Sequence, residues 1–249
     1  MKIGASTLAG IKDNLETSLE FIEGLGIRYA EIVHQYPNEF LNKDILDSYN
    51  LKYSIHAPFI DVNIASIQKR SRINSIDQIK SSVDLACEIG AEAVVVHPGL
   101  IPFIARQFED KVYNIAKQSI NEIGVYSGEV GVLTTIENMP AFDTMIYQNI
   151  NDLHELLVSL DMYMTLDIGH ANHVGYGAGE VYFDSIKHIH IHDNLGDDDA
   201  HLPLGEGTID LKSIVNTFEK KNYNGIYTIE VNDYDSIKKS YEYMKKNFK

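Results

Sequence analysis

Segments that favour β-strands alternate with segments that favour helices along almost the whole chain. The clearest strand is Glu92–His97 (EAVVVH), which is nearly continuously apolar and β-branched, as expected of a strand buried on both faces of a parallel sheet. The clearest amphipathic helix is Gly10–Glu23, where Leu15, Leu19 and Ile22 follow helical spacing. This alternation predicts repeated strand–helix units around a parallel sheet.

The same reading places eight strands and the helices between them. The expected strands are Lys2–Ser6, Arg28–Val33, Tyr53–His56, Glu92–His97, Gly131–Glu137, Tyr163–Asp167, Lys187–His192 and Ile226–Val231. The expected helices are Gly10–Glu23, Leu41–Ser48, Arg72–Ile89, Phe103–Ile123, Asn149–Leu157, Leu211–Lys220 and Asp235–Asn247. Eight strands joined by right-handed crossovers predict a closed (β/α)8 TIM barrel, whereas the alternative, a doubly wound open sheet, normally uses fewer strands at this length. No linker interrupts residues 1–249, which favours a single domain.

The charge and the cysteine content of the chain argue against several classes of function. The chain has 36 acidic and 21 basic residues, a formal net charge of −15, which argues against non-specific binding to nucleic acid. Divalent ions held by some of the acids would reverse the sign locally. Cys87 is the only cysteine, which excludes an intrachain disulfide and a thiolate metal cluster. The chain lacks a secretory leader and any apolar run of about 18 residues, which predicts a cytoplasmic protein without a membrane span.

Ionisable residues recur at the carboxyl ends of the expected strands. They are His56, His97, Glu137, Asp167, His190, His192 and Glu230. In a closed barrel these ends converge on one mouth. Any single residue of the set could simply cap the sheet or a helix. Several carboxylates buried side by side without cations would cost stability, however, so a shared metal site is the better interpretation.

The ligand types indicate which metals fit. Imidazole and carboxylate without thiolate suit zinc, manganese or iron, and they favour a reactive site over a closed structural one. In the strand HIHIH, a period of two puts His188, His190 and His192 on one face. His188 lies deepest and is expected to be a hydrogen-bonded interior residue, while His190 and His192 compete for the ligand role.

Two close pairs lie outside the strands. Asp167 and His170 (DIGH) are three residues apart, where a strand is expected to give way to a loop. Asp199 and His201 (DAH) lie on a second loop. Together the two pairs could hold a further metal ion.

Six motifs in this order carry a family resemblance: HAPF, VVVHPG, IEN, LDIGHAN, HIHD and DAHLPLGEG. With them the chain resembles the xylose-isomerase-like TIM-barrel superfamily from Met1 to about Val231. That superfamily includes the AP endonuclease family 2 enzymes (endonuclease IV) and sugar-phosphate isomerases and epimerases. The resemblance implies a TIM barrel with a metal-dependent active site at its mouth.

The endonuclease IV branch holds three zinc ions, and each ligand position has a suitable residue here. The resemblance implies one ion at His56, His97 and Glu137, a second at Glu137, Asp167, His190 and Glu230, and a third at His170, Asp199 and His201. The isomerase and epimerase branch typically uses one metal at residues like Glu137, Asp167, His190 and Glu230. There the two glutamates move a proton on the sugar carbon.

The sequence departs from the endonuclease pattern in two motifs. It has DIGH where the nucleases usually have DTCH, and HIHDN where they have HLND followed by Ser or Ala. The chain is also shorter than a typical endonuclease IV, so loops that grip DNA are expected to be missing. These departures weaken the nuclease assignment.

Three functional hypotheses follow. The leading one is phosphoester hydrolysis on abasic-site DNA or a related sugar phosphate, with up to three Zn²⁺ ions activating water and stabilising the leaving oxygen. The alternative is isomerisation or epimerisation of a sugar or sugar phosphate at one metal, Zn²⁺ or Mn²⁺, with Glu137 and Glu230 as the acid/base pair. The third is a barrel that only binds a metabolite or a metal.

Overall fold

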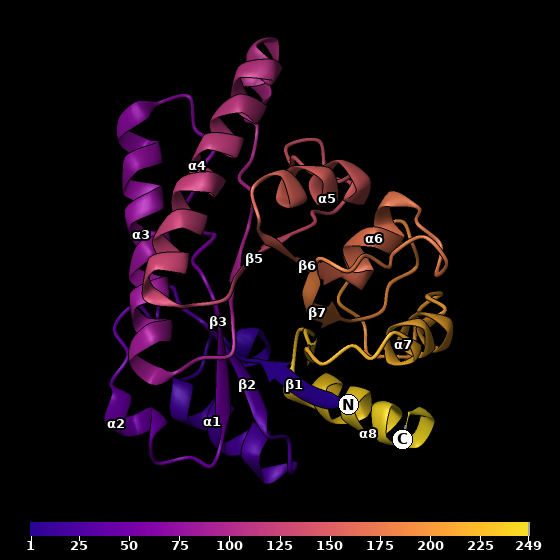
Figure 1. Ribbon diagram of the computed structural model, residues 1–249. Helices are drawn as coiled ribbons and strands as arrows, with labels where there is room; N and C mark the ends of the chain where they lie inside the picture. The colour runs from indigo at the N-terminus through magenta and orange to yellow at the C-terminus, as the bar shows by residue number, and fades with distance from the viewer. Residues whose placement is uncertain (249) are drawn as a thin grey trace.

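The computed structural model describes residues 1–248, and its eight parallel strands close into one barrel (Figure 1). Each strand pairs with the next along the chain, and β8 pairs with β1 to complete the circle. The strands are β1 (Lys2–Ser6), β2 (Tyr29–Val33), β3 (Lys52–His56), β4 (Val94–Val96), β5 (Thr134–Glu137), β6 (Tyr163–Asp167), β7 (Ile186–Ile191) and β8 (Ile226–Ile229). The predicted (β/α)8 barrel is confirmed.

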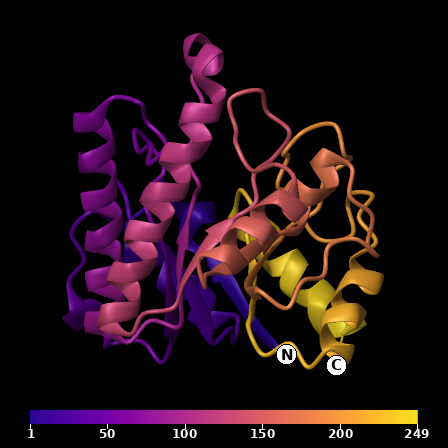
Figure 2. The same cartoon turned by 45° about the horizontal axis from the view of Figure 1, so that its top comes forward.

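Helices surround the barrel, and Figures 1 and 2 both place α8 beside β1. The α-helices are α1 (Leu15–Gly24), α2 (Lys43–Leu46), α3 (Lys69–Ile89), α4 (Glu109–Val130), α5 (Ile150–Ser159), α6 (Ile168–Val174), α7 (Leu211–Lys220) and α8 (Tyr234–Asn247). Two 3₁₀ helices, η1 (Thr7–Gly10) and η2 (Phe103–Phe108), precede α1 and α4. Across residues 1–248, no helix combines the length and the apolar character that crossing a membrane requires.

Alternate strand residues separate an outer apolar layer from an inner polar one. Ile32, Ile189 and Ile229 belong to the buried hydrophobic core between strands and helices. On the other face, Thr135 and Thr165 share a hydrogen bond of 2.6 Å inside the barrel. The inward positions are therefore available to polar side chains, and the last of them on each strand reaches the mouth.

Several helix boundaries differ from the prediction; α1, for example, begins at Leu15 and not at Gly10. The segment expected as one helix over Phe103–Ile123 is η2 followed by α4, and α4 continues to Val130. Gly131 ends α4 in the left-handed conformation (φ 74°), so it caps the helix and is not part of the expected strand Gly131–Glu137.

The helix α6 was not predicted, because its segment was expected to be a loop. Asp167 caps its first turn by accepting a hydrogen bond from the His170 backbone N–H at 2.7 Å. Gly169 lowers the helix propensity of this short segment and conceals the helix in the sequence. A side chain at Gly169 would collide with the His192 ring, so packing requires the glycine.

Phe218 on α7 provides a test of the packing between helices and barrel. It is 0% exposed and packs against the Tyr182 and Tyr223 rings. We expect Phe218→Ala to lower the free energy of unfolding by about 3–5 kcal/mol, because it leaves a cavity. Phe103→Ala, at a position that is 79% exposed, is the matched control and should cost under about 0.5 kcal/mol. Equal losses in urea denaturation would contradict this packing.

Candidate metal centre at the barrel mouth

The barrel brings the ionisable strand-end residues to one place, as the sequence predicts. His56, Glu137 and Asp167 end their strands, and all three are buried. His190 lies on β7, and Glu230 directly follows β8. The carboxyl ends of parallel strands meet at the mouth of a barrel, so these side chains point into the same space.

Four of these residues form the first candidate group. His190 Nδ1 lies 3.0 Å from Glu137 Oε1, 3.3 Å from Glu230 Oε2 and 3.8 Å from Asp167 Oδ2. The four side chains each offer a ligand atom within 4.8 Å of the others. Glu137 Oε2 and Asp167 Oδ2 are buried and have no hydrogen-bond partner among residues 1–248. Such oxygens fit a divalent cation, which would satisfy their lone pairs.

The second group shares Glu137 with the first. Glu137 Oε2 lies 3.4 Å from His56 Nε2 and 3.2 Å from His97 Nε2. His56 Nδ1 donates to the Ala57 carbonyl at 2.8 Å, which leaves Nε2 as the nitrogen directed at Glu137. The two oxygens of Glu137 therefore face different groups, which is the geometry that bridging two sites would need.

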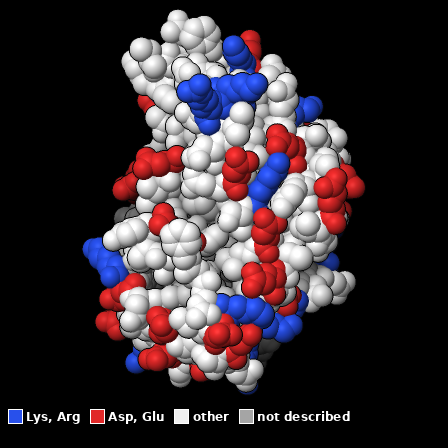
Figure 3. All heavy atoms as spheres, turned by 90° about the vertical axis from the view of Figure 1, so that its left-hand side faces the viewer, with Lys and Arg blue, Asp and Glu red and all other residues white. Residues whose placement is uncertain are grey.

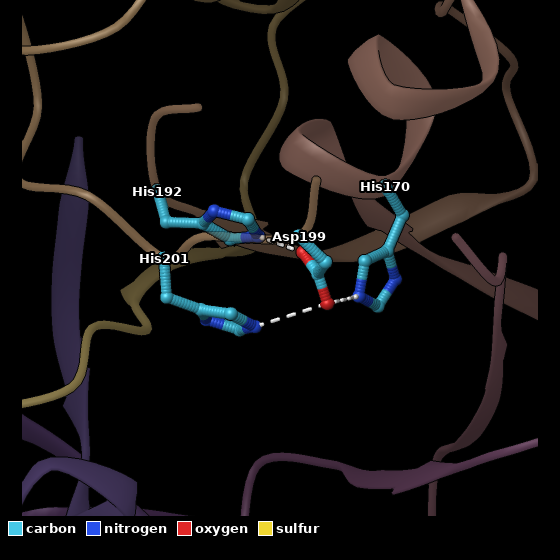
Figure 4. A group of neighbouring side chains, drawn as sticks. All are labelled: His170, His192, Asp199 and His201. Atoms are coloured by element: carbon cyan, nitrogen blue, oxygen red, sulfur yellow. Dashed lines mark hydrogen bonds and ion pairs between the residues drawn. The ribbon is translucent and has the colours of Figure 1, made fainter. Parts of the chain in front are cut away.

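The third group lies beside the first and is drawn in Figure 4. Asp199 Oδ2 is 3.1 Å from His170 Nε2 and 3.3 Å from His201 Nε2, and Asp199 Oδ1 is 3.5 Å from His192 Nε2. The His192 and His201 rings stack with 4.0 Å between centroids. The four side chains converge from α6, the end of β7 and the following loop (Figure 4).

Backbone carbonyls set the direction of the rings in the third group. Nδ1 of His170 donates to the Asn138 carbonyl at 2.8 Å, and Nδ1 of His201 donates to the Glu230 carbonyl at 2.9 Å. Each ring therefore presents Nε2 to Asp199. Fixed orientation of this kind is typical of histidines that bind metals.

The loop that carries Asp199 and His201 is held by Asp193. The Asp193 carboxylate accepts hydrogen bonds from the backbone N–H groups of Gly205 at 2.9 Å and Ile209 at 3.1 Å. A side chain at Gly207 would collide with this carboxylate. The motif HLPLGEG thus keeps the loop folded over the mouth.

Protonated histidines balance the negative charge of the carboxylates in the site. Burial alone would raise the pKa of Glu137, but His190, His56 and His97 hold it well below its usual range. Burial would lower the pKa of His170, but Asp167 and Asp199 raise it to about 10. The same opposition raises the pKa of His201 to about 9, mainly through Asp199 and Glu230. The carboxylates are therefore ionised, and protons on imidazoles supply the positive charge that a cation would otherwise provide.

All nine predicted metal ligands lie in these three groups. They are His56, His97, Glu137, Asp167, His170, His190, Asp199, His201 and Glu230. His190 and His192, which the sequence left in competition, occupy the first and third groups. His188 is the interior residue expected, with Nε2 at 3.0 Å from Thr228 Oγ1.

Sequence reasoning missed two residues that support the site. Asn138 binds the backbone of Asp167 twice, donating to its carbonyl at 3.0 Å and accepting from its N–H at 2.8 Å. Glu31 on β2 is 0% exposed and touches His188 and His190. An acid inside the apolar strand YAEIV was the only signal for Glu31.

A cavity of about 290 Å³ opens onto the three groups. Its polar side consists of His56, His97, Glu137, His170, Asp199, His201 and Glu230, and its other side is apolar, with Phe59, Leu100, Met139, Phe142 and Met145 among the residues there. Within the described chain, no Lys or Arg lines this cavity. Volume and lining suit a small ligand with one polar end.

Comparisons with known proteins agree with this architecture. Residues 19–247 match the xylose isomerase-like TIM barrel family. Uncharacterized protein MJ1311 of Methanocaldococcus jannaschii is 32% identical over 98% of this chain and 88% of its own length. The crystal structure of a D-tagatose 3-epimerase-like protein is 30% identical, with a TM-score of 0.92 over 99% of this chain and 97% of that one.

More distant relatives carry two kinds of name. Fructoselysine 3-epimerase of Shigella flexneri is 25% identical over 64% of this chain and 59% of its own length. Probable endonuclease 4 of Mycobacterium leprae is 29% identical over 69% of this chain and 70% of its own length. The match over residues 19–247 and the full-length similarities decide the family: the chain belongs to the xylose isomerase-like TIM barrel family.

Proposed function

We propose that this protein is a divalent-metal-dependent isomerase or epimerase that acts on a sugar as a single barrel domain. One observation carries the proposal. Two buried glutamates, Glu137 and Glu230, lie 3.0 and 3.3 Å from the same nitrogen of His190 and line the same cavity. This arrangement supplies two carboxylates at a single reacting centre.

Glu137, Asp167, His190 and Glu230 would hold the metal, which we take to be Zn²⁺ or Mn²⁺ from the donor set. When bound there, the cation would act as a Lewis acid on the carbonyl and hydroxyl oxygens of the sugar. Asp167 and His190 are fully buried and therefore serve as ligands only. Glu137 and Glu230 also line the cavity and can reach the substrate.

The two glutamates act as an acid/base pair on the carbon next to the carbonyl. Glu137 comes from β5 and Glu230 follows β8, so the two carboxylates approach the mouth from different sides of the barrel. One removes the proton and the other returns it on the opposite face, which inverts the carbon. The pKa of each is held below its usual range, Glu230 mainly by His190 against the effect of burial, so both are ionised before the substrate binds. The glutamate that returns the proton must therefore first take one from solvent, and the glutamate that removes the substrate proton releases it to solvent after turnover.

The cavity favours an uncharged sugar over a phosphorylated one. Phosphate groups are usually bound by Arg, Lys or backbone N–H groups, and no Lys or Arg among residues 1–248 lines this cavity. The similarity to a D-tagatose 3-epimerase-like protein along the full chain supports a sugar substrate.

An endonuclease IV-type hydrolase, which the sequence placed first, is the second candidate. The specific observation in its favour is the third group around Asp199, together with the similarity to probable endonuclease 4. The net charge of −15 opposes it. On the face formed by α3 and α4, acidic side chains are widely spread and basic ones form small separate groups (Figure 3). Such a face is poorly suited to a DNA backbone.

The acid/base role is tested with Glu230→Gln. In D₂O with Mn²⁺, the wild-type protein should incorporate deuterium from solvent beside the carbonyl of a ketose such as D-tagatose. Glu230→Gln should slow this exchange by about 10²–10⁴-fold, because the amide cannot accept the proton. Glu92→Gln is the matched control: Glu92 pairs with Lys52 outside the site, and its replacement should leave the exchange rate unchanged. Equal rates in wild type and Glu230→Gln would reject the assignment.

Substrate charge provides the second test. We expect kcat/KM for an uncharged ketose to exceed that for its 6-phosphate by at least about 10-fold, because the cavity offers the phosphate no cationic side chain. Steady-state kinetics on both sugars measures the ratio. A higher kcat/KM for the 6-phosphate would favour a sugar-phosphate substrate instead. Nicking of an abasic-site duplex that is lost in Glu137→Ala would favour the hydrolase.

A further inference from the structure

Glu31 lies inside the barrel, one layer below the mouth, in a position that a carboxylate rarely occupies without a reason. Its side chain is 0% exposed. Ser54 Oγ donates to Oε2 at 2.9 Å, and His188 Nε2 lies 2.9 Å from the same oxygen. The other oxygen, Oε1, lies 2.9 Å from His190 Nε2. Burying an ion costs several kcal/mol unless its partners compensate. Ser54 and the two histidines are the partners that can stabilise the buried Glu31 carboxylate.

His190 connects Glu31 to the candidate metal group. Its Nε2 faces Glu31, while its Nδ1 faces Glu137 and Glu230. His190 Nε2 and Glu31 Oε1 are both buried, and neither has a hydrogen-bond partner among residues 1–248. A carboxylate oxygen and an unprotonated imidazole nitrogen are both acceptors and would repel each other at 2.9 Å, so a proton on Nε2 is the state that fits this close approach. By the same reasoning, Nδ1 carries a proton toward Glu137, 3.0 Å away, while the site holds no cation. A cation at the mouth would displace the Nδ1 proton, and the Nε2 proton would stay beside Glu31.

Three other histidines of the site are turned the opposite way. In His56, His170 and His201, Nδ1 lies 2.8–2.9 Å from a backbone carbonyl, and Nε2 faces the carboxylates. In His190 the roles of the two nitrogens are exchanged, and Glu31 takes the place of the carbonyl. His190 therefore depends on a side chain from another strand for its orientation.

We propose that Glu31 is a positioning residue that keeps a proton on His190 Nε2 and so makes Nδ1 the metal-binding atom. The inference rests on the proposed function, because it takes His190 as one of the four metal ligands. Glu31 touches neither the cavity nor the substrate. A carboxylate that orients a ligand histidine also raises its basicity, and loss of such a partner typically weakens metal binding by 10- to 100-fold.

The experiment compares the wild-type protein with Glu31→Gln, both freed of metal before the titration. Calorimetric titration with Zn²⁺ should give a dissociation constant about 10- to 100-fold higher for Glu31→Gln, because a neutral amide holds the Nε2 proton less strongly. Nitrogen-15 NMR of the zinc-loaded wild-type protein should show His190 coordinated through Nδ1 and protonated at Nε2. His190→Gln identifies the His190 signals.

Thr228→Val is the matched control. It removes the Thr228 hydroxyl, which lies 3.0 Å from His188 Nε2 in the same buried network, and it leaves Glu31 and His190 in place. We expect Thr228→Val to lower the melting temperature but to keep the zinc affinity and the His190 NMR signature. Equal weakening of zinc binding in both variants would mean that the network acts only on stability, and would overturn the proposal.

If Glu31→Gln does not fold, the nitrogen-15 NMR spectrum of the wild-type protein still tests the role of Glu31. Coordination of His190 through Nε2, absence of a proton on Nε2, or failure of the wild type to bind zinc overturns the role of Glu31. Unchanged zinc affinity in folded Glu31→Gln does the same. Failure of sugar isomerisation with zinc binding and the NMR signature intact would reject the proposed function alone.

Discussion

Buried negative charge at the barrel mouth is the constraint on which the rest of this structure depends. Glu137, Asp167 and Glu230 converge within the space of one ion, and Asp199 stands beside them. Each ionised carboxylate removed from water costs several kcal/mol unless positive charge and hydrogen bonds compensate. The surrounding histidines provide that compensation in the metal-free protein, and a divalent cation would do so with shorter contacts.

The fold supports this concentration of charge from two sides. Outward-facing residues of the strands form the apolar core with the helices, while inward-facing residues such as Thr135, Thr165 and Glu31 form a buried polar layer beneath the mouth. Hydrogen bonds from the imidazoles to backbone carbonyls, and the contact of Glu31 with His190, fix the ring orientations before any ligand binds. Preorganised ligands of this kind suit a site that binds a cation and orients a small sugar against it.

The sequence predicts the barrel, because strand and helix patterns alternate along the chain. It also selects nine candidate ligands that the fold brings close together, mostly because parallel strands bring their carboxyl ends to one mouth; their role as metal ligands stays a prediction. It does not predict α6, since Gly169 hides the helical pattern and the need for it comes from the distant His192 ring. The role of Glu31 is also not predicted, because its two histidine partners lie on β7, over 150 residues away in the chain. The sequence could not decide between the hydrolase and the isomerase or epimerase, because the same ligand types serve both. The feature that favours the second is the partly apolar cavity lining without Lys or Arg, and loops from several strands form that lining.

The most direct test of this account is calorimetric titration of the metal-free protein with Zn²⁺ or Mn²⁺ near pH 7 in buffers of different ionisation enthalpy. If protons on the histidines stand in for the cation, metal binding must release them. The observed heat should then depend on the buffer, and the melting temperature should rise with metal concentration. Absence of binding, or binding whose heat is the same in every buffer, would contradict the account.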